Sequence, residues 1–172
     1  MTIDTNKTEK IIQEYLLDEE ILRKKLKNPN IDFGFQLSFP PGSKGHPMSL
    51  TKPKGKDFLL ISVGIQISPP YIKALDSLKD NKKMLFFKEL RKFIIFKNMF
   101  FRIDIQNHRY ELFDQIFIKK DSTISKNSLY KRIRYLFNCT QYSNLMLDDF
   151  CSGQVKHEDV KRTMGTDYSF YT

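Results

Sequence analysis

Two stretches of the chain place an apolar residue at every second position, and this period-two pattern constrains the fold more than any other feature. Residues 32–39 do so with three phenylalanines and a leucine, and residues 58–68 with five aliphatic side chains. The first set is Phe33, Phe35, Leu37 and Phe39, and the second is Leu59, Ile61, Val63, Ile65 and Ile67. Because successive side chains of a strand point to opposite faces, both stretches predict strands with one buried face. Residues 48–52 are a candidate for a short strand between them.

Apolar residues at helical spacing predict a first helix ahead of these strands. Asn6 followed by Glu9 is typical of a helix N-terminus. Four apolar residues then share one helical face, and "NPN" at residues 28–30 is expected to end the helix. These four are Ile11, Tyr15, Leu22 and Leu26.

Two further helices are predicted in the middle of the chain. Ser68 can cap free amides and the two prolines after it fit a first turn, so a helix is expected from there to about Leu78. After a break near "KDNKK", a second helix has a core face made of Phe86, Phe87, Leu90, Phe93 and Ile94. Its opposite face groups the basic residues Lys88, Arg91 and Lys92.

The remaining pattern predicts a hairpin and a last helix. The alternating positions of the hairpin are Phe101, Ile103 and Ile105, then Tyr110, Leu112, Ile116 and Ile118, with "NHR" as a tight connection. Ser125 or Ser128 opens the last helix. Its inner stripe is Leu129, Ile133, Leu136, Thr140 and Leu147.

The order helix, strands, helices, hairpin, helix indicates an α+β fold. We expect a mostly antiparallel sheet of about five strands with helices packed on one face. With 172 residues the chain has the size of one domain. We place that domain at residues 1–150 and expect a polar C-terminal tail at residues 151–172.

Composition sets aside several classes of protein. No apolar run approaches the roughly 18 to 20 residues of a membrane span, and the N-terminus lacks the apolar core of a secretory signal. We therefore expect a soluble, cytoplasmic protein with no membrane partner. Cys139 and Cys151 are the only cysteines and are expected to be free thiols, because they lie about 18 Å apart along the predicted helix. With the histidines scattered, we expect neither a metal site nor a cofactor.

The net charge of +9 makes acidic partners or nucleic acid plausible. The excess falls on two segments: residues 73–102 hold nine bases against three acids, and residues 119–134 hold six against one. Both segments are largely helical in our prediction. The candidate anion contacts are Lys52, Lys54, Lys56, Lys88, Arg91, Lys92, Arg132 and Arg134.

The glycines and lysines between Phe39 and Asp57 raise the question of a phosphate loop. Such a loop needs the GxxxxGK[ST] spacing and leads directly into a helix. This segment lacks the spacing and leads into a strand, so we interpret it as a connection with turn glycines and solvated lysines, among them Lys44. A looser role, in which its lysines meet a phosphate backbone, stays open.

No group of residues predicts catalysis. Cys139 falls beside the core stripe of its helix, Cys151 stands at a helix end without a nearby histidine, and the adjacent Asp148 and Asp149 point to different sides. We read Asp32 as an ordinary carboxylate opposite the phenylalanine face. We therefore expect a protein that is not an enzyme.

Aromatic residues at two places suggest a binding surface. The outward face of the last helix carries Lys131, Tyr135, Asn138 and Tyr142, with Met146 near them. This mixture of side chains suits a protein interface or stacking on bases. It is equally found where tyrosines are half exposed with their hydroxyls in water. In the hairpin, Phe113 and Phe117 lie opposite the buried positions, as Leu60 does in its own strand. Contiguous exposed apolar surface of this kind usually marks an interaction site.

Three segments together resemble a known family. They are "PNIDFGFQLSFPPGS", then "TKPKGKDFLLISVGIQISPPYIKAL", then a helix ending in "FFKELRKFIIF". Over about residues 7–150 they resemble archaeal proteins grouped as domain of unknown function 2299. That group is similar in architecture to type III secretion chaperones, in which a helix-covered antiparallel sheet pairs as a homodimer and binds extended protein segments. The resemblance implies a fold and no reaction.

The leading hypothesis is therefore a homodimeric, chaperone-like interaction domain that binds a protein or peptide partner. The competing hypothesis is a nucleic-acid binder that uses the basic helices, whose binding would weaken steeply with salt.

Overall fold

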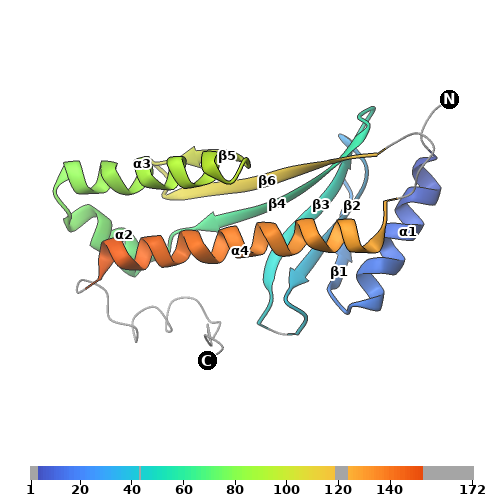
Figure 1. Cartoon of the computed structure of the whole chain (residues 1–172), viewed down its shortest axis with the longest axis horizontal. Coiled ribbons are helices and arrows are strands. Elements are labelled where there is room, and N and C mark those ends of the chain that lie inside the picture. The colour runs from blue at the N-terminus through green and yellow to red at the C-terminus, as the bar shows by residue number, and fades with distance from the viewer. Residues whose placement is uncertain (1–3, 43, 119–123, 153–172) are drawn as a thin grey trace. The chain divides into compact units, whose positions relative to one another are not determined.

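The computed structural model describes residues 4–42, 44–118 and 124–152. This part holds four helices and six strands (Figure 1). The order is α1 (Thr5–Asp18), β1 (Leu22–Lys25), β2 (Ile31–Phe39), β3 (His46–Pro53), β4 (Phe58–Gln66), α2 (Pro69–Ser77), α3 (Asp80–Phe96), β5 (Phe100–Asp104), β6 (Arg109–Phe117) and α4 (Lys126–Cys151). The strands form one sheet in the order β1-β2-β3-β4-β6-β5. The predicted α+β class is confirmed, with one strand more than the five expected. The predicted tail lies outside the described residues from position 153 onward.

The chain groups into two compact units. Unit 1 comprises Met1–Val63 with Leu112–Phe137, and unit 2 comprises Gly64–Glu111 with Asn138–Thr172. Each has buried aromatic side chains of its own, which are Phe33 and Phe35 in unit 1 and Phe86 and Phe87 in unit 2. The strands β4 and β6 and the helix α4 contribute residues to both units.

The additional strand, β1, lies where the first helix was predicted to continue, and that prediction is wrong. Helix α1 is capped by Asp4, not Asn6, because the Asp4 carboxylate accepts a hydrogen bond from the Lys7 amide. It ends at Asp18 in a left-handed turn at Glu20, whose φ is 58°. The amides of Glu20 and Ile21 close this turn on the carbonyls of Leu17 and Leu16, which satisfies the helix end.

Leu22 and Leu26 continue the helical spacing only by coincidence. The backbone from Leu22 to Lys25 pairs with β2, with Leu22 opposite Leu37. The amide of Leu26 donates to the carbonyl of Gly34. Pairing with a neighbouring strand therefore outweighs the local helical pattern, since a strand edge offers partners that no local sequence pattern reveals.

The segment from residue 39 to 57 forms two turns with strand β3 between them. β3 pairs antiparallel with β2 and β4, so the candidate strand at residues 48–52 is confirmed and extends over His46–Pro53. Gly55 has a φ of 70°, and a Cβ at Gly45 would lie 2.3 Å from the Pro40 carbonyl oxygen. Both glycines are thus required by the turns, as the prediction of a plain connection expects.

Lys52 was predicted to be solvated, and this is wrong. Its side chain is buried, and its ammonium lies 2.8 Å from the Asp32 carboxylate and also donates to the Lys56 carbonyl. Lys52 occupies the same face of β3 as the buried Leu50, so its charge can reach only a partner supplied by the fold. Lys54 and Lys56 in the following turn are exposed as predicted.

In unit 1, α1 and the first half of α4 cover the buried side of the strands. Leu129, Ile133 and Leu136 of α4 are fully buried, as predicted. The hydroxyl of Tyr130 donates to the Tyr15 carbonyl of α1. The ammonium of Lys126 pairs with Asp18, the last residue of that helix, and with Glu19, which follows it. The Ser125 hydroxyl accepts from the Ser128 amide and so caps α4.

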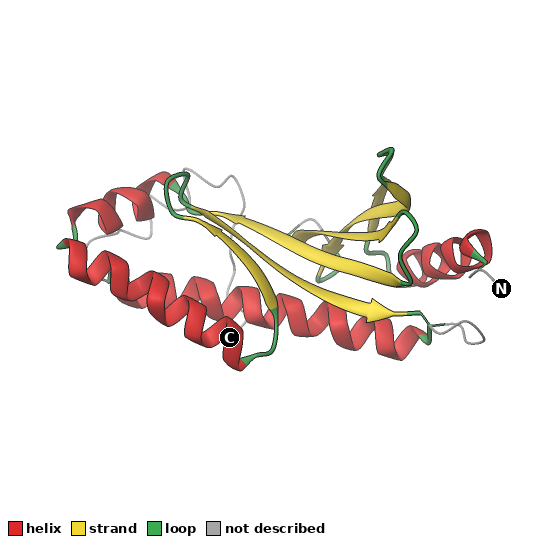
Figure 2. Cartoon of the chain, turned by 90° about the horizontal axis from the view of Figure 1, so that it is seen from above, coloured by secondary structure: helices red, strands yellow, loops and turns green. Residues whose placement is uncertain are grey.

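In unit 2, α2 and α3 follow one another through a tight turn and pack with the second half of α4 (Figure 2). Phe86 of α3 lies edge-on to Phe87 and to Phe150 of α4. Ser68 stands at the predicted start of α2, but its side chain makes no capping hydrogen bond. The predicted hairpin is confirmed as β5 and β6, with β5 ending at Asp104, one residue before Ile105.

Tyr110 fixes β6 to α4 within unit 2. Its hydroxyl lies 2.8 Å from the Ser143 hydroxyl, which in turn donates to the Thr140 carbonyl. Because the Ser143 proton is already used, Tyr110 is the donor of the first bond. Burial raises the pKa of Tyr110 to about 12, so the hydroxyl keeps the proton that it donates.

The first prediction concerns the ion pair in unit 1 between the buried Lys52 and the partly exposed Asp32. Asp32→Asn removes the charge that faces the buried Lys52 ammonium, so we expect a loss of about 3 kcal/mol in the free energy of unfolding by urea. Glu89→Gln, which breaks the exposed pair with Lys92, is the control and should change stability by less than about 1 kcal/mol. The double variant Asp32→Asn, Lys52→Met should recover part of the loss. Equal effects of Asp32→Asn and Glu89→Gln would contradict this account.

The second prediction concerns His46, whose Nε2 is buried without a hydrogen-bond partner among the described residues. Burial lowers the pKa of His46 below 6.5, so the unfolded chain binds a proton more readily than the folded one as the pH falls below that value. Stability from this histidine is therefore present above pH 6.5 and is lost as the pH falls toward the lower folded pKa. Thermal melting between pH 7.5 and 5 should show a steeper loss for the natural chain than for His46→Gln. Superimposable pH profiles would refute the assignment.

Candidate functional site

The open face of the sheet in unit 1 carries an aromatic pair. Phe117 of β6 is 65% exposed, and its ring meets that of Phe58 of β4 edge-on at a centroid distance of 5.8 Å. Leu60 and Phe113, from the same two strands, are half-buried beside them in the alternation. We call these four residues the aromatic sheet face. The predicted exposure of Phe117 is confirmed, whereas Phe113 is more covered than expected.

Two hydroxyl groups near the aromatic sheet face are satisfied within the chain. The hydroxyls of Ser49 on β3 and Ser62 on β4 lie 2.8 Å apart and hydrogen-bond to each other. A surface of this kind can be covered by a partner without leaving these hydroxyls unpaired. The chemistry of the face is therefore that of apolar contact.

The outward face of α4 is divided between the two units. In unit 1, Lys131 is exposed and Tyr135 is half-buried. In unit 2, Asn138 is exposed, and the half-exposed ring of Tyr142 stacks on Phe93 of α3 at a centroid distance of 4.5 Å. Tyr142 thus presents one ring face to α3 and the other part of its surface to solvent.

Some of the candidate anion contacts already pair with a carboxylate of the chain, whereas others have no such partner among the described residues. Arg132 is 53% exposed in its side chain, but its guanidinium lies 3.0 Å from the buried carboxylate of Asp114. Lys92 donates to Glu89 at 2.7 Å. Lys88 and Arg91 on α3 and Arg134 on α4 are exposed. Asp114 was not singled out from the sequence, because nothing local reveals that α4 brings an arginine to it.

Exposed apolar residues gather in unit 2, and the sequence analysis missed most of them. Seven of the nine exposed large hydrophobic residues in the described part of the chain belong to this unit. They are Met84, Leu85, Ile95, Phe96, Phe100, Tyr142 and Leu145. The signal was present for α3, because Ile95 and Phe96 fall outside the buried stripe that contains Phe86, Leu90 and Ile94.

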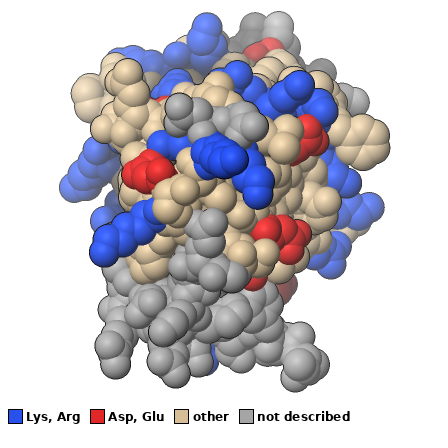
Figure 3. Space-filling view, turned by 90° about the vertical axis from the view of Figure 1, so that its left-hand side faces the viewer, with Lys and Arg blue, Asp and Glu red and all other residues tan. Residues whose placement is uncertain are grey.

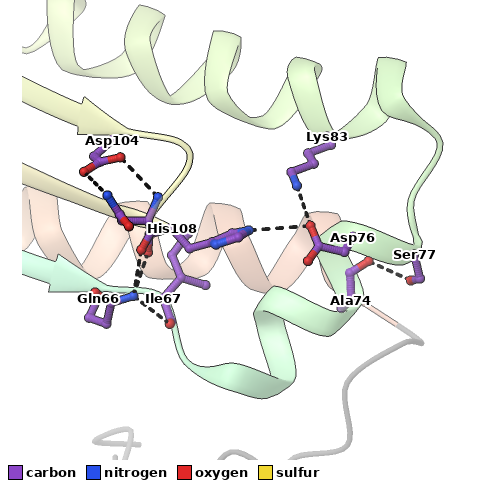
Figure 4. A network of polar contacts seen from close by, with 9 residues as sticks. Gln66, Ile67, Ala74, Asp76, Ser77, Lys83, Asp104 and His108 are labelled. Carbon is purple, nitrogen blue, oxygen red and sulfur yellow. Dashed lines mark hydrogen bonds and ion pairs between the residues drawn. The ribbon is translucent and has the colours of Figure 1, made fainter.

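A polar network holds the β5–β6 turn in unit 2 (Figure 4). Asp104 accepts from the amide and side chain of Asn107, and the Gln66 side chain donates to the carbonyls of Asn107 and His108. The His108 imidazole reaches to 3.5 Å from the Asp76 carboxylate of α2.

Asp76 also pairs with Lys83 of α3. The hydrogen bond from Lys83, with a smaller contribution from His108, lowers the pKa of Asp76. The carboxylate is half exposed, so solvent screens these charges. We assign the network a structural role: it fixes the left-handed turn at His108, whose φ is 50°.

A shallow hollow of about 400 Å³ lies on the strands of unit 2. Gly64 leaves room in it, and Arg102 and Arg109 stand on its rim. Each arginine is paired: Arg102 with Glu111 at 3.6 Å and Arg109 with Asp104 at 3.2 Å. Because the charges balance, the hollow does not select for an anion.

The residues that could act as nucleophiles are poorly placed for it. Cys139 and Cys151 are buried and are not joined by a disulfide. Burial, and then the nearby Asp148 carboxylate, raise the pKa of Cys151 to about 11, so its reactive thiolate form is disfavoured at neutral pH. Asp148 accepts a hydrogen bond from the Tyr71 hydroxyl at 2.7 Å, whereas Asp149 is exposed.

Within the residues that the structure describes, no three histidine, cysteine or carboxylate side chains come together as a metal site requires. None of the described helices combines the length and apolarity needed to cross a membrane.

Comparisons with known proteins agree with this fold. The chain is similar to the crystal structure of an uncharacterized protein from Methanothermobacter thermautotrophicus, with a TM-score of 0.74 and 24% sequence identity over 83% of this chain and 97% of that one. At this identity the likeness shows the fold alone. No curated protein sequence matches the chain. A family model described as an uncharacterized conserved protein, DUF2299, matches residues 8–147. The chain belongs to the DUF2299 family of uncharacterized conserved proteins.

Proposed function

We propose that this chain is a non-enzymatic protein-interaction domain that pairs with a second copy of itself through the aromatic sheet face of unit 1. The observation that supports the proposal is the ring pair of Phe58 and Phe117, with Phe117 65% exposed on a strand. When a partner covers an exposed aromatic ring, the complex gains roughly 25 cal/mol of free energy for each Å² of apolar surface that is buried.

A second copy is the simplest occupant of this face. Most soluble oligomers are symmetric dimers, in which the same patch of both subunits meets itself. Two sheets can pack face to face when their outward residues are apolar, and the aromatic sheet face provides such residues on the neighbouring strands β4 and β6. The mutually bonded hydroxyls of Ser49 and Ser62 add no unpaired group to such a contact.

Beyond pairing, we propose a chaperone-like activity in which the dimer binds an extended segment of another protein. The support for this step is the resemblance in architecture to secretion chaperones, together with the exposed Tyr142 and the half-buried Tyr135 on α4. Tyrosine is enriched at protein interfaces because it combines a large apolar ring with a polar hydroxyl.

Nucleic-acid binding is the alternative, and the exposed Lys88 and Arg91 on α3 favour it. Two of the residues predicted to contact phosphates already pair with carboxylates of the chain: Lys52 is buried against Asp32, and Arg132 pairs with Asp114. Fewer free cations mean fewer phosphate contacts and a weaker dependence of binding on salt.

The third prediction tests the dimer. Phe117→Asp places a charge in the centre of the aromatic sheet face, so size-exclusion chromatography with light scattering should give the mass of one chain, 20.4 kDa, where the natural protein gives twice that value. Because Phe117 is 65% exposed, the variant should keep its far-UV circular dichroism, and its melting temperature should fall only by the stabilisation that dimerisation gives the natural chain. Phe96→Asp makes the same change at a residue of unit 2 that is 83% exposed and should leave the dimer intact.

Either of two results would overturn the proposed dimer. The natural chain could run as a monomer at micromolar concentration, or Phe96→Asp could dissociate the dimer while Phe117→Asp does not. The second result would move the interface to α3.

A further inference from the structure

The outward side of α3 in unit 2 combines exposed apolar and basic side chains on one surface. Its members are Met84, Leu85, Lys88, Arg91, Lys92, Ile95 and Phe96, and we call them the α3 outer face. Each member has another member three or four residues away, and residues at that spacing lie beside one another along a helix. From Met84 to Phe96 the face is about 18 Å long, or slightly more than three turns.

The apolar residues of the α3 outer face have no role in the core. The core side of the same helix is formed by Phe86, Phe87, Leu90 and Ile94, which are buried. By contrast, Phe96 is 83% exposed and Ile95 is 65% exposed, with Met84 and Leu85 about half exposed at the other end. Two apolar ends therefore flank a basic centre.

The positive charge of the face is not cancelled nearby. No described carboxylate forms an ion pair with Lys88 or Arg91, and Glu89 pairs with Lys92. Asp76 of α2 pairs with Lys83. Lys97 lies over the rings of Phe93 and Phe96 and adds a further cation at the helix end. Figure 3 shows Lys and Arg on more of the visible surface than Asp and Glu.

We infer that the α3 outer face binds an acidic amphipathic segment of a partner protein, with carboxylates opposite Lys88 and Arg91 and apolar side chains against the two apolar ends. Charge complementarity identifies this occupant, because a partner must supply negative charge in the centre and apolar surface on both sides. A helical segment of about three turns with apolar residues at i, i+3, i+4 and i+7 has the matching length and pattern.

Two other anionic partners fit the face less well. A nucleic acid would contact the basic centre, but of the four apolar side chains of the face only Phe96 offers a flat ring for a base to stack on. A helix that binds at a lipid surface keeps its apolar residues on one side, whereas the apolar stripe of α3 is buried in its own core and the outer face is mixed. The inference uses residues of unit 2 only and does not rest on the aromatic sheet face.

The fourth prediction tests the partner chemistry with a phage-displayed library of random 16-residue peptides, selected on the natural full-length chain. Selected peptides should be enriched in Asp and Glu and should carry large apolar residues at helical spacing. A synthetic copy of the strongest peptide should bind at least tenfold more tightly than a scrambled version of it and than polyglutamate of the same length. Binding equal to that of polyglutamate would overturn the inference, because charge alone would then explain it.

Variants assign the binding to the face. Lys88→Glu with Arg91→Glu should weaken the binding of the peptide at least tenfold, because it removes the positive charge of the centre. Ile95→Ser with Phe96→Ser should also weaken the binding at least tenfold, because it removes one of the two apolar ends. Lys7→Glu with Lys10→Glu, at exposed residues of α1 in unit 1, makes the same change of charge away from the face and should leave the affinity unchanged. Unaltered affinity in both α3 variants would refute the site. Tighter binding to a DNA duplex, or to vesicles of mixed neutral and anionic phospholipid, than to the selected peptide would equally contradict it.

Discussion

The burial of only one face of each strand is the constraint from which the other surfaces of this protein follow. In unit 1, the side chains of Leu59, Ile61 and Val63 point toward the helices and are buried. The alternation then forces Phe58 and Leu60 to the opposite face, where the described helices do not cover them fully. An aromatic residue at such a position gives little to the core of its own chain, and this is the observation on which the proposed contact with a second copy rests.

The basic character of the chain divides into two physical roles. Lys52 and Arg132 belong to the fold, because each pairs with a carboxylate that the strands hold in place. Within the part of the chain that the structure describes, Lys88 and Arg91 have no such partner, and they lie among exposed apolar side chains of α3. A net charge calculated from composition cannot separate these roles, since it depends on which cations remain available to a partner.

The sequence predicted the periodic parts of the fold and failed where distant residues meet. The strands, the hairpin and the inner stripe of α4 were predictable because each repeats a local spacing. The edge strand β1 was not, because its backbone pairs with β2 across a turn while Leu22 imitates a helical position. The burial of Lys52 depends in the same way on Asp32, twenty residues away in the sequence.

Some features of the candidate site were also predictable from local spacing, whereas others depended on residues far away in the sequence. Phe117 was predictable from alternation, and the exposure of Phe96 was equally predictable, because the helical spacing of α3 places Phe96 outside the core face. The half-burial of Phe113 and the ring of Phe93 under Tyr142 depend on neighbours that only the fold supplies.

Hydrogen exchange measured by mass spectrometry at low and high protein concentration tests the central claim most directly. If two copies meet through the aromatic sheet face, amides in residues 58–63 and 112–117 should exchange more slowly at high concentration, while those of residues 84–96 should not change. Exchange in β4 and β6 that does not depend on concentration, or protection confined to α3, would contradict this account of the protein.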